Sequence, residues 1–236
     1  NLLLDSDLQA TQRGYAKTVV KSAEALLEII NDILDIEKIE SGNMKIHIQE
    51  VQASDFLAQA VEGNNAYGEK FNIKFDLQEA PNVKVLADPD RLMQIMSNLL
   101  SNAAKFSPQG ATVNVRAMKA SGNKVRFEVE DHGGGIPEEF RSRIFQKFSQ
   151  ADGATTRHHE GTGLGLSISK QLIEAMHGEL AFHTELGKGT IFYFELPAAE
   201  KEEMPAMELN GEIMHKILIC EDDLEIAGFI QKCLQN

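Results

Sequence analysis

The sequence has few cysteines and few basic residues, and it has no long hydrophobic run. Its 236 residues include two cysteines, Cys220 and Cys233, which is too few for a disulfide framework and typical of a reducing, cytoplasmic setting. Lys and Arg number 23 against 36 Asp and Glu, so the net charge is −13. This acidity, with a pI of about 5.0, argues against a nucleic-acid partner. No apolar run approaches the ~18 residues of a membrane helix.

The first residues carry neither a signal peptide nor an initiating Met, so we expect the chain to be part of a longer protein. Residues 11–40 then carry a helical pattern of about 45 Å. Its apolar stripe repeats at heptad spacing: Val19, Ala23, Leu26, Ile30 and Ile33. The stripe is too wide for one helix to bury, which predicts a hairpin that dimerises into a four-helix bundle. The alternative is one amphipathic helix lying on its own globular domain.

Strand and helix periods alternate from residue 43 to residue 197, which predicts an α+β sandwich with a mixed sheet under helices. Asp88 followed by Pro89 is an N-cap signal, and Ser54 is a second candidate cap. We expect helices over 54–67, 89–106 and 162–176 and a short helix after Pro137, strands over 44–48, 72–77, 83–86, 112–120, 124–131, 179–184 and 190–196, and a mobile loop over 149–160.

The composition changes after residue 197. Residues 197–215 contain Pro197, Pro205 and several Glu, and are typical of a linker. Residues 216–220 then form an apolar strand pattern, followed by Glu221, Asp222 and a helical pattern to residue 234. One strand and one helix are too little for a domain, so we expect only the beginning of one.

Two polar clusters in the sandwich are candidates for chemistry. Asn98, Asn102 and Lys105 fall at i, i+4 and i+7 on one helix face. Amide oxygens suit Mg²⁺ and an ammonium suits phosphate. The bland alternative is a solvated polar face. Asp131 ends a predicted strand and can accept a hydrogen bond from an exocyclic amine such as that of adenine. The glycines after it, Gly133 and Gly135, either let a ligand approach the backbone or only form a tight turn.

A third cluster, residues 161–166, reads Gly-Thr-Gly-Leu-Gly-Leu and runs directly into a helix. Free N–H groups at a helix N-terminus suit phosphate. No strand precedes this cluster, so a Rossmann interpretation fails its context test, and the sequence of a P-loop is missing.

The order of these motifs, with Phe145, Lys147 and Phe148 as an F-x-K-F box between the second and third, resembles the catalytic ATP-binding domain of sensor histidine kinases. The resemblance covers residues 1–197 and implies a Bergerat-type ATP-binding fold. Residues 1–42 resemble part of the dimerisation and phosphotransfer hairpin: residues 11–40 resemble its second helix, and residues 1–4 the tail of its first. Residues 43–197 resemble the catalytic domain. Residues 198–215 are then the linker, and 216–236 resemble the start of a receiver domain. The whole resembles a hybrid kinase.

The resemblance also implies roles for single residues. Asn102 would coordinate Mg²⁺ with help from Asn98, while Lys105 and Phe106 would border phosphates and adenine. Asp131 would bind the adenine amine, with the pocket framed by Gly133, Gly135 and Ile136. Lys147 would reach toward phosphate. Glu221 and Asp222 would bind the receiver's Mg²⁺ if that domain is complete. Gly161, Gly163 and Gly165 would form the hinge of a lid that spans roughly residues 149–163, and Thr162 and Leu164 would contact the nucleotide.

Two departures from the family pattern stand out. The box that carries the phosphorylated His has no match here, so the resemblance puts that His upstream of this chain. Glu160 stands where a Gly commonly precedes the third cluster. The isolated chain is therefore expected to bind Mg²⁺–ATP without phosphorylating itself. Its partners would be a second copy and a receiver domain in cis or a response regulator. It would be cytoplasmic, or the cytoplasmic part of a membrane-anchored sensor.

Two other functions remain open. ATPases of the same superfamily carry a catalytic Glu shortly before the Asn, but residues 91–97 contain no acid. A degenerate kinase that only dimerises and binds a partner is the second alternative, and intact Asn102 and Asp131 argue against it. His158 and His159 resemble a metal pair, but adjacent loop residues without Cys or Asp support are weak ligands.

Overall fold

The computed structural model describes residues 10–149, 162–199, 208–209 and 212–213. The chain divides into two compact units, Asn1–Lys201 and Glu202–Asn236. In the second unit, β8 (Glu208–Leu209) and β9 (Glu212–Ile213) pair antiparallel, inside the segment expected to be a linker. The predicted strand and helix over 216–234, with Glu221 and Asp222, lie outside the described residues.

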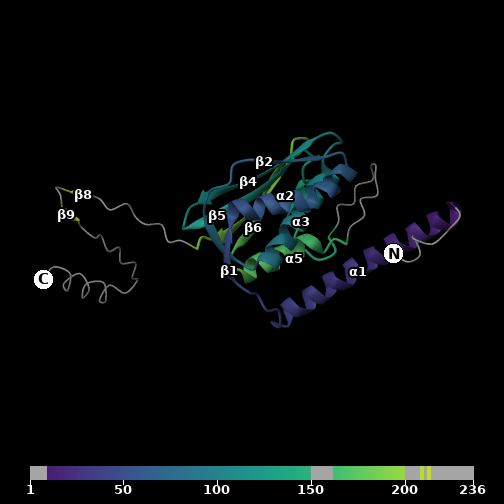
Figure 1. Ribbon diagram of the computed structural model, residues 1–236, viewed down its shortest axis with the longest axis horizontal. Coiled ribbons are helices and arrows are strands. Elements are labelled where there is room, and N and C mark those ends of the chain that lie inside the picture. The colour runs from purple at the N-terminus through teal and green to yellow at the C-terminus, as the bar shows by residue number, and fades with distance from the viewer. Residues whose placement is uncertain (1–9, 150–161, 200–207, 210–211, 214–236) are drawn as a thin grey trace. The chain divides into compact units, whose positions relative to one another are not determined.

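The first unit is built on a five-stranded mixed sheet, which confirms the predicted α+β class. Its strand order is β2-β4-β5-β7-β6, and only β2 and β4 run parallel. The strands are β2 (Lys74–Leu77), β4 (Thr112–Ala120), β5 (Lys124–Asp131), β6 (Glu179–Glu185) and β7 (Gly189–Pro197). Figure 1 shows helices α2 (Ala53–Lys70), α3 (Pro89–Phe106) and α5 (Gly165–Ala175) gathered on one side of this sheet.

The core lies between the sheet and these helices. Phe127 of β5 and Phe194 of β7 stack with ring centroids 4.9 Å apart, and Phe56 of α2 meets Phe127 edge-on at 5.8 Å. Helix α3 buries a full apolar stripe against them: Leu92, Ile95, Met96, Leu99, Leu100, Ala103 and Ala104. This stripe fixes the rotation of α3 about its axis and therefore which side chains its polar face presents.

Helix α3 begins as the sequence predicts. Oδ1 of Asp88 accepts hydrogen bonds from the backbone N–H groups of Asp90 (3.1 Å) and Arg91 (3.2 Å). Its Oδ2 accepts a third from His47 N–H at 2.9 Å. The cap is nearly fully buried, so it fastens the segment after α1 to the start of the helix that carries the candidate site.

Two local predictions are wrong. Residues 44–48 form no strand; β1 is Gln49–Gln52 and pairs antiparallel with β3 (Lys84–Ala87). Gln49 already faces Ala87, and the next partner would be Asp88, whose side chain caps α3 instead. Ser54 is not the cap of α2, because that helix begins at Ala53 and its N-cap position, Gln52, makes no side-chain cap bond.

Helix α1 (Ala10–Glu40) confirms the long predicted helix, and Figure 1 shows its C-terminal half beside α5. Ile36 is buried there, whereas the heptad stripe is exposed: Val19 is 60% exposed and Leu26 57%. Short α4 (Glu138–Arg141) follows Pro137 as predicted. In the part of the chain that the structure describes, no helix is long and apolar enough to span a membrane.

Candidate nucleotide-binding site

The polar face of α3 holds two asparagines in direct contact. Asn102 donates from Nδ2 to Oδ1 of Asn98 at 3.3 Å, and Asn98 donates from Nδ2 to Oγ of Ser169 on α5 at 2.9 Å. Both asparagines are half-buried, as is Lys105 one turn further on, and Phe106 at the helix end is exposed. The structure therefore brings Asn98 and Asn102 together as the spacing predicts and adds Ser169, which sequence reasoning missed.

Asp131 ends β5 as a buried carboxylate, only 7% exposed. Its Oδ1 accepts hydrogen bonds from Gly133 N–H at 2.8 Å and from Thr190 N–H at 3.3 Å. Burial raises the pKa of Asp131, and the two backbone hydrogen bonds oppose that shift. Among the described residues both donors lie on Oδ1, which leaves Oδ2 to accept from a ligand amine.

Close packing requires glycine at positions 133 and 135 of the loop after Asp131. A Cβ on Gly133 would lie 2.6 Å from the carbonyl oxygen of Phe106, and one on Gly135 would lie 2.4 Å from that of Glu185. Gly135 also has φ +73°, a region that L side chains rarely adopt. The loop after β5 therefore packs directly against the end of α3 on one side and the β6–β7 turn on the other.

The β6–β7 hairpin braces this loop, which the sequence did not indicate. Ile136 donates its backbone N–H to Oγ1 of Thr184 at 2.9 Å, and Gly187 donates to the carbonyl of Gly134 at 2.9 Å. A Cβ on Gly189 would lie 2.0 Å from the carbonyl oxygen of Asp131. The only sequence signal was a hairpin turn at Gly187 and Gly189. Nothing in the pattern indicated that the turn touches the loop.

The third cluster packs against the first. A Cβ on Gly165, the first residue of α5, would lie 2.3 Å from Oδ1 of Asn98. Gly163 has φ +71°, and a Cβ there would lie 3.0 Å from the backbone of Phe148. Leu164 between them is fully buried. The helix starts at Gly165 rather than at the predicted Thr162, because Thr162 Oγ1 accepts from Leu164 N–H at 3.1 Å in a turn of its own.

Some predicted site residues lie elsewhere or are not described. Lys147, expected near phosphate, forms an ion pair with Glu40 at the C-terminal end of α1. Thr162 Oγ1 donates to Oδ2 of Asp32 on α1 at 3.0 Å. Gly161, His158, His159 and the predicted lid lie outside the described residues.

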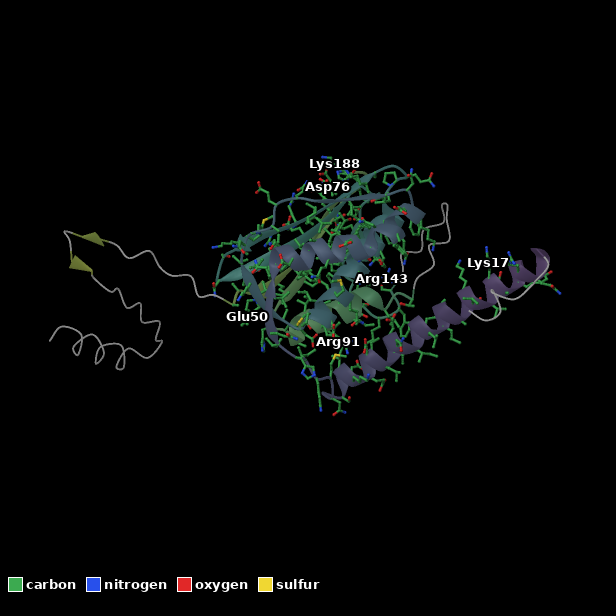
Figure 2. All side chains as sticks on the ribbon, viewed as in Figure 1. Lys17, Glu50, Asp76, Arg91, Arg143 and Lys188 are labelled. Carbon is green, nitrogen blue, oxygen red and sulfur yellow. The ribbon has the colours of Figure 1, made fainter. Side chains whose placement is uncertain are left out.

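The C-terminal half of α1 binds this unit through polar contacts. Oδ2 of Asp35 accepts from Gln94 Nε2 at 2.9 Å and pairs with Arg91 Nη1 at 3.3 Å. Figure 2 labels Arg91 on the side of the unit that faces α1, and Lys17 far along the helix from that contact. Helix α1 therefore contacts both the F-x-K-F box and the helix that carries Asn98 and Asn102.

The fold and this site define a class of protein. Residues 87–200 match the family described as "Histidine kinase-, DNA gyrase B-, and HSP90-like ATPase". The match contains Asn98, Asn102, Asp131 and the residues of α5. Within that class, the chain belongs to the sensor histidine kinases, as a part that carries their catalytic ATP-binding domain.

Three relatives illustrate the likeness. The circadian input-output histidine kinase CikA of Synechococcus elongatus is 37% identical over 235 residues, covering 96% of this chain and 31% of CikA. Full-length ShkA in complex with AMPPNP has a TM-score of 0.73 and 34% identity, over 85% of this chain and 42% of ShkA. ThkA in complex with the response regulator protein TrrA has a TM-score of 0.61 and 25% identity; the match covers 81% of this chain and 53% of the ThkA chain. The chain spans 22 to 31% of the first curated relatives it matches.

Proposed function

We propose that the chain is the ATP-dependent core of a protein-histidine kinase. It binds Mg²⁺–ATP, and a His upstream of this chain attacks the γ-phosphorus, displacing ADP. The phosphoryl group then passes to a receiver Asp. One observation carries this proposal: the three motifs meet at two glycine contacts, Gly133 against the end of α3 and Gly165 against Asn98. ShkA, which is similar to this chain, forms a complex with AMPPNP, and this supports a nucleotide as the ligand.

The residues present fit the nucleotide and its metal. Oδ2 of Asp131 would accept the adenine amine, and exposed Phe106 would cover the base with its ring. The amide oxygen of Asn102, with Asn98 beside it, would hold Mg²⁺, which neutralises phosphate charge when bound. Lys105 adds a positive charge on the same face of α3. The free N–H groups at the start of α5 suit phosphate oxygens.

The exposed stripe of α1 supports a second copy as partner. Three of its apolar side chains, Val19, Leu26 and Ile30, are 42 to 60% exposed in the single chain. Fully burying a wholly exposed side chain of this kind contributes about 1.5–3 kcal/mol, so covering the exposed part contributes about half of that. The second partner is a receiver domain in cis or a response regulator; the complex of ThkA with the response regulator protein TrrA supports a response regulator.

The fate of γ-labelled phosphate tests this function. The chain, and a version extended upstream by about one helix, are mixed with Mg²⁺–ATP. We expect acid-labile, base-stable label on the extended protein and none on the 236 residues alone, because the acceptor box has no match here. The extended Asn102→Ala variant should take up no label.

Other outcomes identify the alternatives. Free phosphate without labelled protein would support an ATPase of the same superfamily. The residues before Asn98 argue against that outcome, because Arg91–Ser97 includes no carboxylate that could activate water. Absence of both turnover and nucleotide binding would leave a non-catalytic interaction module. Label on the chain alone would contradict the placement of the acceptor upstream.

A further inference from the structure

Ser169 is a buried hydroxyl on α5 with a partner on another helix. Its side chain is part of a residue only 2% exposed, between buried Ile168 and buried Leu172. Such a hydroxyl costs free energy unless it is hydrogen-bonded. The bond it makes is to Nδ2 of Asn98 on α3, at 2.9 Å. Ser169 therefore ties the start of α5 to the polar face of α3.

Ser167, two residues earlier on the same helix, behaves differently. It is equally buried, at 3% exposure, but its Oγ donates to the carbonyl of Leu164 at 2.7 Å, within its own turn. Its hydrogen-bonding need is met locally. Ser167 therefore contributes only to the structure of its own helix, whereas Ser169 contacts a residue of the candidate metal site.

The bonds to Ser169 and Asn102 hold the two branches of the Asn98 amide. Because Nδ2 is used by Ser169, Oδ1 is turned toward Asn102 and accepts from its Nδ2. Asn102 then presents the other branch of its planar amide, Oδ1, away from Asn98. Oxygen is the ligand atom that Mg²⁺ takes, whereas an amide nitrogen is not.

Gly165 holds the same amide from a second direction. A Cβ at this position would lie 2.3 Å from Oδ1 of Asn98 and 2.8 Å from its Cγ. Asn98 is therefore enclosed by the first residue of α5 and hydrogen-bonded by the fifth. Little room remains for its amide to rotate.

We propose that Ser169 is a positioning residue: it anchors the Asn98 amide in place and thereby supports Asn102, which presents Oδ1 to the Mg²⁺ of Mg²⁺–ATP. Ser169 touches neither metal nor nucleotide. The inference rests on the proposed function, because it needs Asn102 to be the metal ligand. Residues that orient metal ligands commonly change metal affinity by about 10- to 100-fold when they are removed.

The test compares ATP affinity with and without the metal. The dissociation constant of ATP is measured in Mg²⁺ and in EDTA for the wild-type chain, Ser169→Ala and Ser167→Ala. For Ser169→Ala we expect about tenfold weaker binding in Mg²⁺ and a change within about twofold in EDTA. For Ser167→Ala we expect the ratio of the two constants to match the wild type, although its stability falls.

A second pair of variants separates the loss of the hydroxyl from a loss of folding stability. Ser169→Thr and Ser169→Val add the same volume at a packed position, so overpacking costs both about equally. Only Thr keeps the hydroxyl. We expect Thr to retain the Mg²⁺ dependence of the wild type and Val to lose it, with thermal melting measured for both.

The outcomes separate this inference from the proposed function. If Asn102→Ala loses the Mg²⁺ dependence but Ser169→Ala and Ser169→Val keep it, the positioning role is wrong and the metal assignment stands. Equal weakening in Mg²⁺ and in EDTA would mark Ser169 as merely structural and also overturn the inference. If Asn102→Ala keeps the wild-type dependence, the metal assignment itself fails, and the inference fails with it.

Discussion

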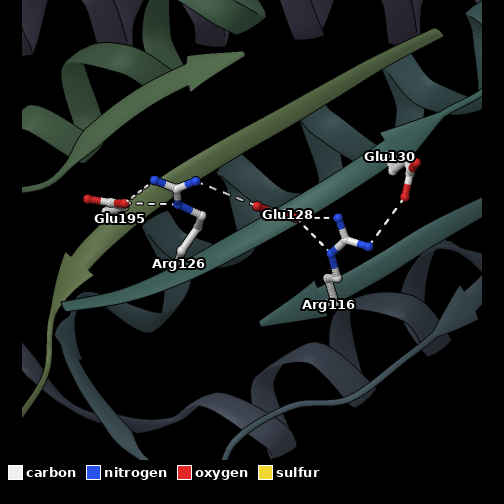
Figure 3. Close-up of polar contacts among 5 residues, drawn as sticks. All are labelled: Arg116, Arg126, Glu128, Glu130 and Glu195. Carbon is white, nitrogen blue, oxygen red and sulfur yellow. Dashed lines mark hydrogen bonds and ion pairs between the residues drawn. The ribbon is translucent and has the colours of Figure 1, made fainter. Parts of the chain in front are cut away.

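Two polar clusters of the first unit differ in how their charges are satisfied. On the sheet face opposite the helices, Arg126 pairs with Glu195 at 2.6 Å and Arg116 pairs with Glu128 at 2.7 Å (Figure 3). Arg116 also reaches Glu130 at 3.5 Å. At the candidate site, by contrast, Asp131 is held by backbone N–H groups and Asn98 by a serine hydroxyl. We call the first cluster the arginine ladder.

The ladder is complete without a ligand. Arg126 and Glu195 are directly opposite in the β5–β7 register, as are Arg116 and Glu128 in the β4–β5 register, and each positive group has a carboxylate. The hydrogen bond to Glu195 raises the pKa of Arg126 still further. Asp131 is buried beside neutral donors, which hold its carboxyl in place but do not neutralise it. Charge pairing therefore stabilises the sheet, whereas the site keeps an uncompensated carboxylate that a ligand can use.

The largest effect expected from this difference is on nucleotide affinity. Asp131→Ala removes the carboxylate proposed to bind the adenine amine, and a hydrogen bond to a charged group contributes about 1.5–3 kcal/mol. We expect the dissociation constant of ATP, measured by calorimetry, to rise about 10- to 100-fold. Glu62→Ala, which removes an exposed carboxylate of α2, is the matched control and should bind like the wild type. Unchanged affinity in Asp131→Ala would break the adenine assignment.

The uncompensated carboxylate should also reduce stability as pH rises. Since the folded pKa of Asp131 is raised, the folded state binds its proton more tightly than the unfolded state. Its contribution to stability is present below the ordinary Asp pKa and is lost as pH rises through the raised value. Asp131→Asn does not titrate, and its amide oxygen can still accept from Gly133 and Thr190.

We therefore expect the stability of Asp131→Asn relative to the wild type to increase as pH rises through that window, while its ATP affinity falls. Urea denaturation from acid to neutral pH measures the difference. A difference in unfolding free energy that stays constant with pH would mean that the folded and unfolded pKa values are equal.

Breaking the arginine ladder should lower the stability of the protein and leave its ATP affinity unchanged. Arg126→Met removes the pair with Glu195 and a guanidinium that lies 4.2 Å from the centre of the Tyr193 ring. The side chain is 30% exposed, so solvent screens the pairing. We expect a loss of about 1–2 kcal/mol in unfolding free energy and unchanged ATP affinity. Arg143→Met, at an exposed position outside the ladder, should be nearly neutral. A weakened ATP affinity in Arg126→Met would contradict the separation of the two clusters.

The elements that the sequence predicts are those whose signals are local. Asp88 and Pro89 predict the start of α3, and the alternation of apolar and polar residues predicts the β4–β5 hairpin; both predictions are confirmed. The prediction of a strand over 44–48 was wrong because alternating polarity does not show whether a partner strand is available. The partner of β1 is β3, which ends at Ala87, just before the Asp88 cap. The prediction that Ser54 caps α2 was wrong because that helix already begins at Ala53, so Ser54 lies inside it.

The candidate site follows the same rule. Asn98 and Asn102 meet because their spacing on one helix requires it. Ser169 and Thr184 could not be found, because their contacts join residues 71 and 48 positions apart and neither serine nor threonine carries a motif here. The pairing of Lys147 with Glu40 spans 107 positions, so the sequence offered only the role implied by the resemblance.

The smallest expected effect on ATP affinity comes from breaking the ion pair between Lys147 and Glu40. Lys147 and Glu40 are 33% and 52% exposed, and such pairs contribute about 0.2–1 kcal/mol. Glu40→Gln removes the carboxylate and leaves Lys147 without this competitor for phosphate. If Lys147 also binds phosphate, as the resemblance implies, we expect Glu40→Gln to tighten ATP binding by no more than about fivefold, since the freed energy is at most that of the pair. Lys147→Gln should weaken ATP binding, and adding Glu40→Gln to it should change nothing further. Equal ATP affinities in the wild type and all three variants would assign Lys147 to α1 alone, as a charged contact comparable to the ladder rather than part of the site.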